Sequence, residues 1–160
     1  MYCEAAENKP VRCVAVAVRN ELKMALRVTI IEDSRESEIE FLKSLEPQVN
    51  DVQMQLITAA PYFNDKLEWA IAKFDPDLII LDLLLLDKIE SGLKILTQIK
   101  QSAALKKVPV IVCSDFIGNS PTDRNRTRAL RLGAEDALSK NPFPKAHEFL
   151  RHIKRNMSNQ

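Results

Sequence analysis

The amino-acid sequence predicts an α/β fold, in which a parallel sheet carries helices on both faces. From Leu26 onward, short runs rich in Val, Ile and Leu alternate with longer amphipathic segments. This alternation is typical of repeated strand–helix units, whose strands pair in parallel. Three of the runs are almost continuously apolar, as strands covered on both faces are. The length of 160 residues fits one domain and is short for two.

Five strands are expected, and all but the second lead into a polar residue. They cover residues 26–31, 52–58, 77–83, 108–113 and 136–139. The first, third and fourth of these runs are the continuously apolar ones. They therefore carry most of the argument for a parallel sheet buried between helices.

A helix is expected after each strand. The first helix is expected over 35–46, and the second is expected to end at the stop signal Asp75-Pro76. The third begins at about Ser91, and the fourth and fifth are expected over 122–132 and 144–155. In the first helix we expect Ile39, Leu42 and Leu45 to be buried. We expect Trp69 of the second helix to pack against the sheet. His147 and His152 of the last helix have no matched ligand partners in the sequence, so we interpret them as surface residues.

Composition excludes several classes of protein. Apolar residues make up 46% and charged residues 28% of the chain, which is ordinary for a globular domain. The longest apolar run, 78–86, is interrupted by Asp82 and is far shorter than the roughly 18 residues that span a bilayer. Cys3, Cys13 and Cys113 form no metal-binding or disulfide pattern, which favours a reducing cytoplasm. We expect a soluble, cytoplasmic protein without a membrane segment.

The chain divides into one domain and two flanking segments. Residues 1–24 do not fit the strand–helix pattern and are interpreted as an N-terminal extension, although 11–18 is apolar enough to form a strand. The domain is expected over 25–156, and 157–160 form a tail. No function is assigned to the extension.

Polar residues at the strand ends are the candidate functional residues. The first strand leads into Glu32 and Asp33, the third into Asp82, the fourth into Ser114 and the fifth into Lys140. In an open α/β sheet, functional side chains gather beyond the carboxyl ends of the strands. If these strands are neighbours, the five side chains converge on one pocket.

Such a pocket has a definite chemistry. Clustered carboxylates repel one another unless a cation neutralises them, and an all-oxygen cluster suits Mg²⁺ better than Zn²⁺. A lysine and a hydroxyl nearby supply donors for the oxygens of a transferred phosphoryl group. The aspartate then attacks and becomes an acyl phosphate.

Each of these residues also has a structural interpretation. Asp33 and Ser114 at strand ends are the kind of residue that caps a helix or forms a turn, and Lys140 is compatible with a solvated charge. Asp82 is harder to explain structurally, because a carboxylate between Leu81 and Leu83 is costly to bury without a partner.

Four segments resemble the signature segments of response-regulator receiver domains, in the same order. They are RVTIIEDS, DLIILDLLL, VPVIVCSD and GAEDALSKNP, and the resemblance covers roughly 26–155. It is closest to the stand-alone, chemotaxis-regulator-like kind. It implies a five-stranded parallel sheet of flavodoxin-like order 2-1-3-4-5, which makes the four functional strands neighbours.

The resemblance also implies a role for each candidate residue. Glu32 and Asp33 hold Mg²⁺ (or Mn²⁺), Asp82 is both metal ligand and phosphoryl acceptor, and the Leu84 backbone carbonyl is a further ligand. Ser114 is the switch hydroxyl, and Lys140 pairs with the phosphate. The implied protein is a phosphoacceptor rather than a turnover enzyme, and a histidine kinase or phosphotransfer protein is its donor.

The expected output is a protein contact. No output domain follows the last helix, so we expect a single-domain regulator, monomeric or weakly dimeric, that signals through its own surface. From Ser114 onward there are nine Lys/Arg against five Asp/Glu. The basic fourth and fifth helices favour an acidic protein partner over nucleic acid, because no recognition helix or basic arm accompanies them.

The sequence departs from the receiver pattern at several positions, and two alternatives stay open, the first because of these departures and the second because it also uses a strand-end aspartate nucleophile. Asp115 follows the switch hydroxyl where a small residue is usual, and Ala137 occupies the aromatic switch position. Leu86 replaces a proline in a lengthened loop that adds Asp87 and Glu90. One alternative is a phosphorylation-independent interaction module. The other is a haloacid-dehalogenase-type phosphatase, which expects a second aspartate where this chain has Leu84.

Overall fold

The computed structural model describes residues 26–45, 52–57 and 64–157, with side chains of the last helix described as far as Ile153. The predicted N-terminal extension, residue 25 and positions 158–160 of the predicted tail lie outside this part of the chain. So do Glu46 and Thr58, at the ends of a predicted helix and a predicted strand.

The described residues form a five-stranded parallel sheet with five helices. The strands are β1 (Leu26–Ile31), β2 (Val52–Ile57), β3 (Leu78–Leu81), β4 (Val110–Ser114) and β5 (Asp136–Ser139). The helices are α2 (Arg35–Leu45), α3 (Asp65–Phe74), α4 (Ile89–Gln101), α5 (Arg124–Arg131) and α6 (Ala146–Met157). The strand order is β2-β1-β3-β4-β5 and every pairing is parallel. The predicted fold class and strand order are confirmed.

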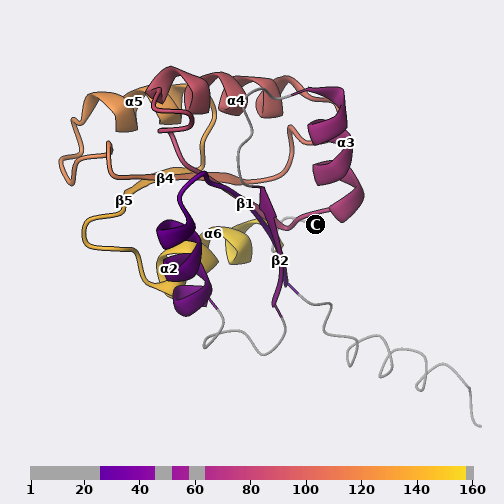
Figure 1. Ribbon diagram of the computed structural model, residues 1–160, viewed down its shortest axis with the longest axis horizontal. Helices are drawn as coiled ribbons and strands as arrows, with labels where there is room; N and C mark the ends of the chain where they lie inside the picture. Colours follow the sequence, from indigo (N-terminus) through magenta and orange to yellow (C-terminus); the bar gives the residue numbers. More distant parts are fainter. Residues whose placement is uncertain (1–25, 46–51, 58–63, 158–160) are drawn as a thin grey trace, which may run out of the picture.

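Helices cover both faces of the sheet, and each face has its own core. Figure 1 shows α3, α4 and α5 on one side of the sheet and α2 and α6 on the other. Because successive residues of a strand point to opposite faces, β3 serves both cores. Ile79 and Leu81 pack toward α3–α5, whereas Leu78 and Ile80 pack toward α2 and α6. This explains why the third run is continuously apolar.

Capping residues fix where two of the helices begin and end. The Asn64 side chain accepts a hydrogen bond from the Leu67 amide and begins α3. Asp75, in the left-handed conformation with φ 54°, ends the same helix, and its amide donates to the carbonyl of Ile71. Asp123 caps α5 through the Arg126 amide. The helix therefore begins two residues later than the predicted position 122.

The buried face of α2 differs from the predicted one. Ile39 is 42% exposed, and Phe41 and Leu45 are the buried residues of the helix. Phe41 makes edge-to-face contacts with Phe143 and Phe149, at ring-centroid distances of 4.9 and 5.9 Å. These aromatic contacts orient the helix about Phe41, so Ile39 turns outward.

Trp69 also lies where the sequence did not predict it. Its side chain is 62% exposed on the outside of α3, and Ile71 is the buried residue of that helix. None of the described helices is long and apolar enough to cross a membrane.

Candidate functional site

Backbone hydrogen bonds hold three candidate residues at the carboxyl end of the sheet. The Glu32 amide donates to the Ile57 carbonyl at 3.1 Å, and the Asp82 amide donates to the Ile31 carbonyl at 3.0 Å. The Lys140 amide donates to the Ser114 carbonyl at 3.2 Å. The parallel pairing thus continues one residue beyond β1, β3 and β5. The hydrogen bonds of the sheet therefore fix the backbone positions of these three residues.

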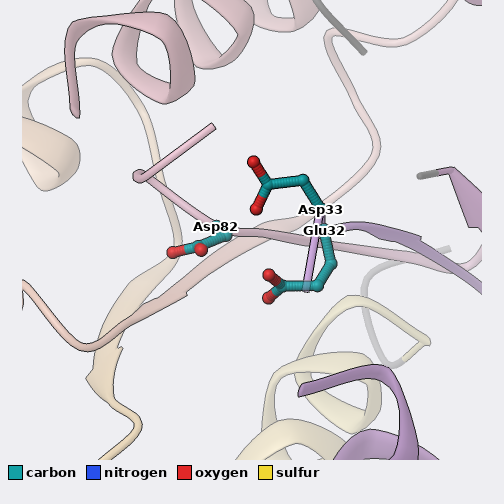
Figure 2. Close-up of side chains that lie close together, drawn as sticks. All are labelled: Glu32, Asp33 and Asp82. Carbon is teal, nitrogen blue, oxygen red and sulfur yellow. The ribbon is translucent and has the colours of Figure 1, made fainter. Parts of the chain in front are cut away.

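The three predicted metal ligands form a carboxylate cluster. Glu32, Asp33 and Asp82 each offer an oxygen, and these oxygens lie within 4.8 Å of one another. Figure 2 shows the three side chains gathered where β1 and β3 end, with Glu32 and Asp33 extending to opposite sides of the chain. Glu32 and Asp82 are 1% and 6% exposed, whereas Asp33 is open to solvent.

Lys140 reaches into this cluster and uses all of its donors there. Its ammonium donates to Glu32 Oε2 at 2.5 Å, to Ser37 Oγ at 3.1 Å and to Asp82 Oδ2 at 3.2 Å. A lysine ammonium has three N–H donors, so these acceptors saturate it. The structure therefore brings Lys140 and Asp82 together, as the sequence predicted.

Ser37 is a member of the site that the sequence analysis did not include. It lies four residues after Asp33, in the first turn of α2, and its hydroxyl accepts from Lys140. A side chain one turn into a helix faces back toward the strand end that precedes it. The spacing of four residues from Asp33 could have indicated that Ser37 lies at the site. Its contact with Lys140, however, joins residues 103 positions apart in the sequence.

The electrostatics of the cluster are unbalanced. Burial and the nearby Asp82 charge raise the pKa of Glu32, although the hydrogen bond from Lys140 acts in the opposite direction. Burial alone lowers the pKa of Lys140, but the carboxylates of Asp82 and Glu32 outweigh it and raise the pKa. Three carboxylates face one ammonium, so ionisation of all of them leaves an excess of two negative charges.

Asp82 also has an oxygen that the protein leaves without a partner. Oδ2 faces Lys140, whereas Oδ1 is buried and has no hydrogen-bond partner among the described residues. A buried carboxylate oxygen without a donor is costly. An all-oxygen cluster with excess negative charge and a bare buried oxygen fits a hard divalent cation such as Mg²⁺ or Mn²⁺.

The loop after β3 is tied to this cluster through Asp33. The Leu86 amide donates to Asp33 Oδ2 at 2.9 Å. Leu86 and Asp87 both have positive φ, 53° and 58°, and form the centre of a tight turn between Leu85 and Lys88. Leu84 precedes this turn, two residues after Asp82.

Gly92 lets the end of β3 and the first turn of α4 meet. A Cβ at position 92 would fall well inside contact distance of the Leu83 backbone, and the Gly92 amide donates to the Leu83 carbonyl at 3.2 Å. The glycine is therefore required by a close approach. It keeps the loop that contains Leu84 against the site.

Ser114 is the last residue of β4, and Asp115 follows it. Ser114 is fully buried at the end of β4, one residue later than the predicted strand end, and its hydroxyl accepts from the Phe116 amide at 3.4 Å. Asp115 is exposed and lines a cleft of about 460 Å³ with Ser37, Lys140 and Phe143. The cleft gives solvent access to the Lys140 side of the cluster.

Ala137, at the predicted switch position, is fully buried, and its backbone belongs to a second charged cluster. That cluster centres on Asp136 at the opposite end of β5. Asp136 Oδ1 accepts from the Ala137 amide and Arg126, while Oδ2 faces Arg151 and His152 at 2.7 and 3.0 Å. His152 is buried, so its predicted surface position is wrong, because Asp136 supplies an acceptor inside the fold. His147 is exposed, as predicted.

The sequence comparison gives the family. The fold is a doubly wound α/β domain, and its acids and lysine gather beyond the carboxyl ends of the strands, where such domains bind their ligands. Residues 28–154 match the response regulator receiver domain family, and the chain belongs to that family. Receiver domains of response regulators act as phosphoacceptors in two-component signalling and bind a divalent metal at an acidic pocket.

Solved structures agree with the fold. The response regulator domain of Thermotoga maritima CheB is 22% identical, with a TM-score of 0.62, and the match covers 84% of this chain and 98% of that one. The receiver domain of a DNA-binding response regulator from Colwellia psychrerythraea is 24% identical, with a TM-score of 0.55 and coverage of 84% and 99%. The Mn²⁺-bound response regulator Rcp1 is 21% identical, with a TM-score of 0.54 and coverage of 81% and 89%. A search of curated protein sequences finds no significant match.

Proposed function

We propose that this protein is a cytoplasmic response regulator that accepts a phosphoryl group on Asp82. The donor is a histidine kinase or a phosphotransfer protein. The observation that carries the proposal is the state of the Asp82 carboxylate, which is buried, faces Lys140 through one oxygen and leaves the other oxygen bare. A nucleophile needs such an available oxygen, whereas a purely structural aspartate has both oxygens satisfied.

The transfer is a substitution at phosphorus. A carboxylate oxygen of Asp82 forms a bond to phosphorus while the P–N bond of the donor phosphohistidine breaks, and its electron pair leaves on the imidazole. Lys140 exchanges its present contact with Asp82 for one with the phosphoryl oxygens, and the Ser114 hydroxyl is their second donor. The 460 Å³ cleft beside Lys140 provides the approach for the donor side chain.

Glu32, Asp33, Asp82 and the Leu84 carbonyl would hold Mg²⁺ or Mn²⁺ in this proposal. When bound, the cation neutralises the carboxylates and the charge of the phosphoryl oxygens. The net negative charge of the cluster and the bare Asp82 Oδ1 support this assignment. The Leu84 carbonyl belongs to the loop that Asp33 and Gly92 hold against the site.

Phosphotransfer with Asp82→Asn tests the proposal. The substitution keeps the shape of the side chain and removes the nucleophile, so labelling from a phosphorylated donor is expected to disappear. Asp87→Asn is the matched control, because Asp87 lies in the nearby turn with φ 58°, which asparagine tolerates. Label recovered on the Asp82→Asn protein would show that the nucleophile is a different residue.

The output we propose is an acidic protein partner on α5 and α6. Two of the arginines on α5 already have partners within the chain, because Arg126 pairs with Asp136 and Arg128 pairs with Glu90. Arg124, Arg131 and Lys145 remain exposed and make no ion pair among the described residues. Reversing Arg124 and Arg131 to Glu is expected to weaken partner capture and its salt dependence, while Asp82 is still phosphorylated.

A phosphorylation-independent interaction module is the second candidate, and Ala137 favours it. The alanine provides no ring to turn inward, and Arg126 occupies its carbonyl at 2.6 Å. Beryllium fluoride with Mg²⁺ distinguishes the candidates by amide chemical shifts. Changes confined to the ends of β1, β3 and β5 would favour the module, whereas changes that reach α5 and α6 would favour a switching regulator.

A further inference from the structure

The outer face of α3 carries an exposed tryptophan with charged neighbours. Trp69 is 62% exposed and is the most exposed of the large apolar side chains in the described residues. Asp65, Lys66 and Lys73 are exposed as well, whereas Ile71 is buried against the sheet. Figure 1 shows α3 at the margin of the molecule, beside the edge strand β2. None of the residues that the structure describes therefore covers the outer face of this helix.

This face has the properties of a contact surface. A groove of about 520 Å³ runs along it, lined by Asp65, Lys66, Trp69 and Ala70. The Lys73 ammonium lies 4.7 Å from the centre of the Trp69 ring and covers part of it. Tryptophan is the residue type most enriched at the energetic centres of protein interfaces, and an isolated exposed one is unfavourable in water.

The charges on this face of α3 are arranged to complement the charges on the same face of a second copy. Asp65 lies four residues before Trp69 and Lys73 lies four residues after it, so the three occupy one stripe of the helix. In an antiparallel pair of α3 helices with a two-fold axis at Trp69, Asp65 of each copy lies opposite Lys73 of the other. Lys66 then lies opposite position 72, an alanine, so it adds no like-charge contact.

We propose that the occupant of this face is a second copy of the same chain, packed α3 against antiparallel α3 about Trp69. A two-fold interface is self-complementary by necessity, and this pattern of acid, aromatic and base meets that requirement. Two symmetric Asp65–Lys73 pairs flank the stacked tryptophans. One helix face is small compared with a standard interface, so the dimer is weak and concentration-dependent.

The single tryptophan reports the contact directly. Trp69 is the only tryptophan of the chain, so a blue shift of its emission with rising protein concentration reports its burial. Sedimentation equilibrium on the full chain measures the affinity of the same step. Trp69→Ala is expected to weaken the dimer about tenfold or more, the usual effect of truncating a central aromatic residue.

Reversing the charges of Asp65 and Lys73 tests whether these two residues face each other across the proposed dimer. Asp65→Lys and Lys73→Asp each place like charges across the interface, so each variant alone is expected to lose the dimer. An equimolar mixture of the two restores both ion pairs and is expected to associate. Lys94→Asp, on the exposed side of α4, is the matched control and keeps wild-type association. Thermal melts by circular dichroism verify that every variant is folded.

Three outcomes would overturn the proposal. They are a monomer at millimolar concentration, a dimer that Trp69→Ala leaves unchanged, and a mixture of the two charge variants that stays monomeric. A heterologous protein bound at Trp69 by a chain that does not self-associate would likewise replace the second copy as the occupant.

Discussion

Two buried aspartates at opposite ends of the sheet behave in opposite ways. Asp136, at the start of β5, has both oxygens engaged, by the Ala137 amide, Arg126, Arg151 and His152. Asp82, beyond the end of β3, faces one lysine that it shares with Glu32 and has a bare oxygen. The first carboxylate joins α5 and α6 to the sheet, and the second is left available for chemistry. Burial alone does not distinguish the two roles, whereas the supply of hydrogen-bond donors does.

The largest difference between them is expected in stability. Asp136→Asn leaves Arg126 and Arg151 without a counter-charge, and we expect it to lower the free energy of unfolding by about 2–3 kcal/mol. Asp82→Asn is expected to stay within about 1 kcal/mol of wild type, because relief of repulsion with Glu32 and Asp33 offsets the weaker contact with Lys140. Urea unfolding measures both. Equal losses would mean that the two sites are both structural.

The pH dependence of stability follows from the same cluster. Burial acts to raise the pKa of Asp136, but the Ala137 amide, Arg151, His152 and Arg126 together lower it. A carboxylate with a lowered pKa stabilises the fold above its unfolded-state pKa of about 3.9, and this stabilisation is lost as the pH falls through the folded-state value. Wild type is therefore expected to lose more stability than Asp136→Asn below about pH 4. Parallel pH profiles of the two proteins would contradict the assignment.

Metal binding is expected to produce a smaller gain, confined to the Asp82 end. At a Mg²⁺ concentration ten times the dissociation constant, the folded state gains about 1.4 kcal/mol. The gain is expected to disappear in Asp33→Ala/Asp82→Ala and to persist in Asp136→Asn. Calorimetry is the suitable measurement, because Trp69 lies on the outside of α3. Unchanged Mg²⁺ affinity in the double variant would remove these carboxylates as ligands.

The smallest predicted effect concerns Asp115, an exposed residue that lines the cleft. Its charge opposes an incoming anion, so Asp115→Ala is expected to accelerate phosphorylation by acetyl phosphate about two- to fivefold, as one exposed charge can. The difference is expected to shrink as ionic strength rises. Asp123→Asn, outside the residues that line the cleft, controls for a general change in net charge, because asparagine still caps α5. An equal or slower rate for Asp115→Ala would exclude an electrostatic barrier.

The sequence predicted the parts of this protein that depend on local pattern. Apolar runs ending in Glu32, Asp82 and Lys140 predicted the strands. The convergence of these side chains also required the strand order, which came from the resemblance to receiver domains. The helix stop signal at Asp75-Pro76 was equally local. The structure brings Glu32, Asp33, Asp82 and Lys140 together, but the roles in metal binding and phosphoryl transfer remain predictions for all of these residues and for Leu84 and Ser114.

The errors fall on residues whose positions depend on distant contacts. Periodicity alone made Ile39 a core residue, but the aromatic contacts of Phe41 with Phe143 and Phe149 orient the helix differently. His152 is buried because a strand sixteen positions away supplies its acceptor. Trp69 was predicted to pack against the sheet, but Ile71 occupies the buried side of the helix and Trp69 lies on its outside.

A substitution at Gly92 would disturb the geometry of the site without changing any charge in it. Since the backbone of α4 meets the Leu83 backbone with no side chain between them, an added methyl group acts as a wedge between helix and strand. The displaced helix would shift the loop that Asp33 holds through the Leu86 amide. A collection of randomly mutated chains with impaired phosphorylation should therefore include substitutions at this glycine, and their defect would be one of spacing rather than of chemistry.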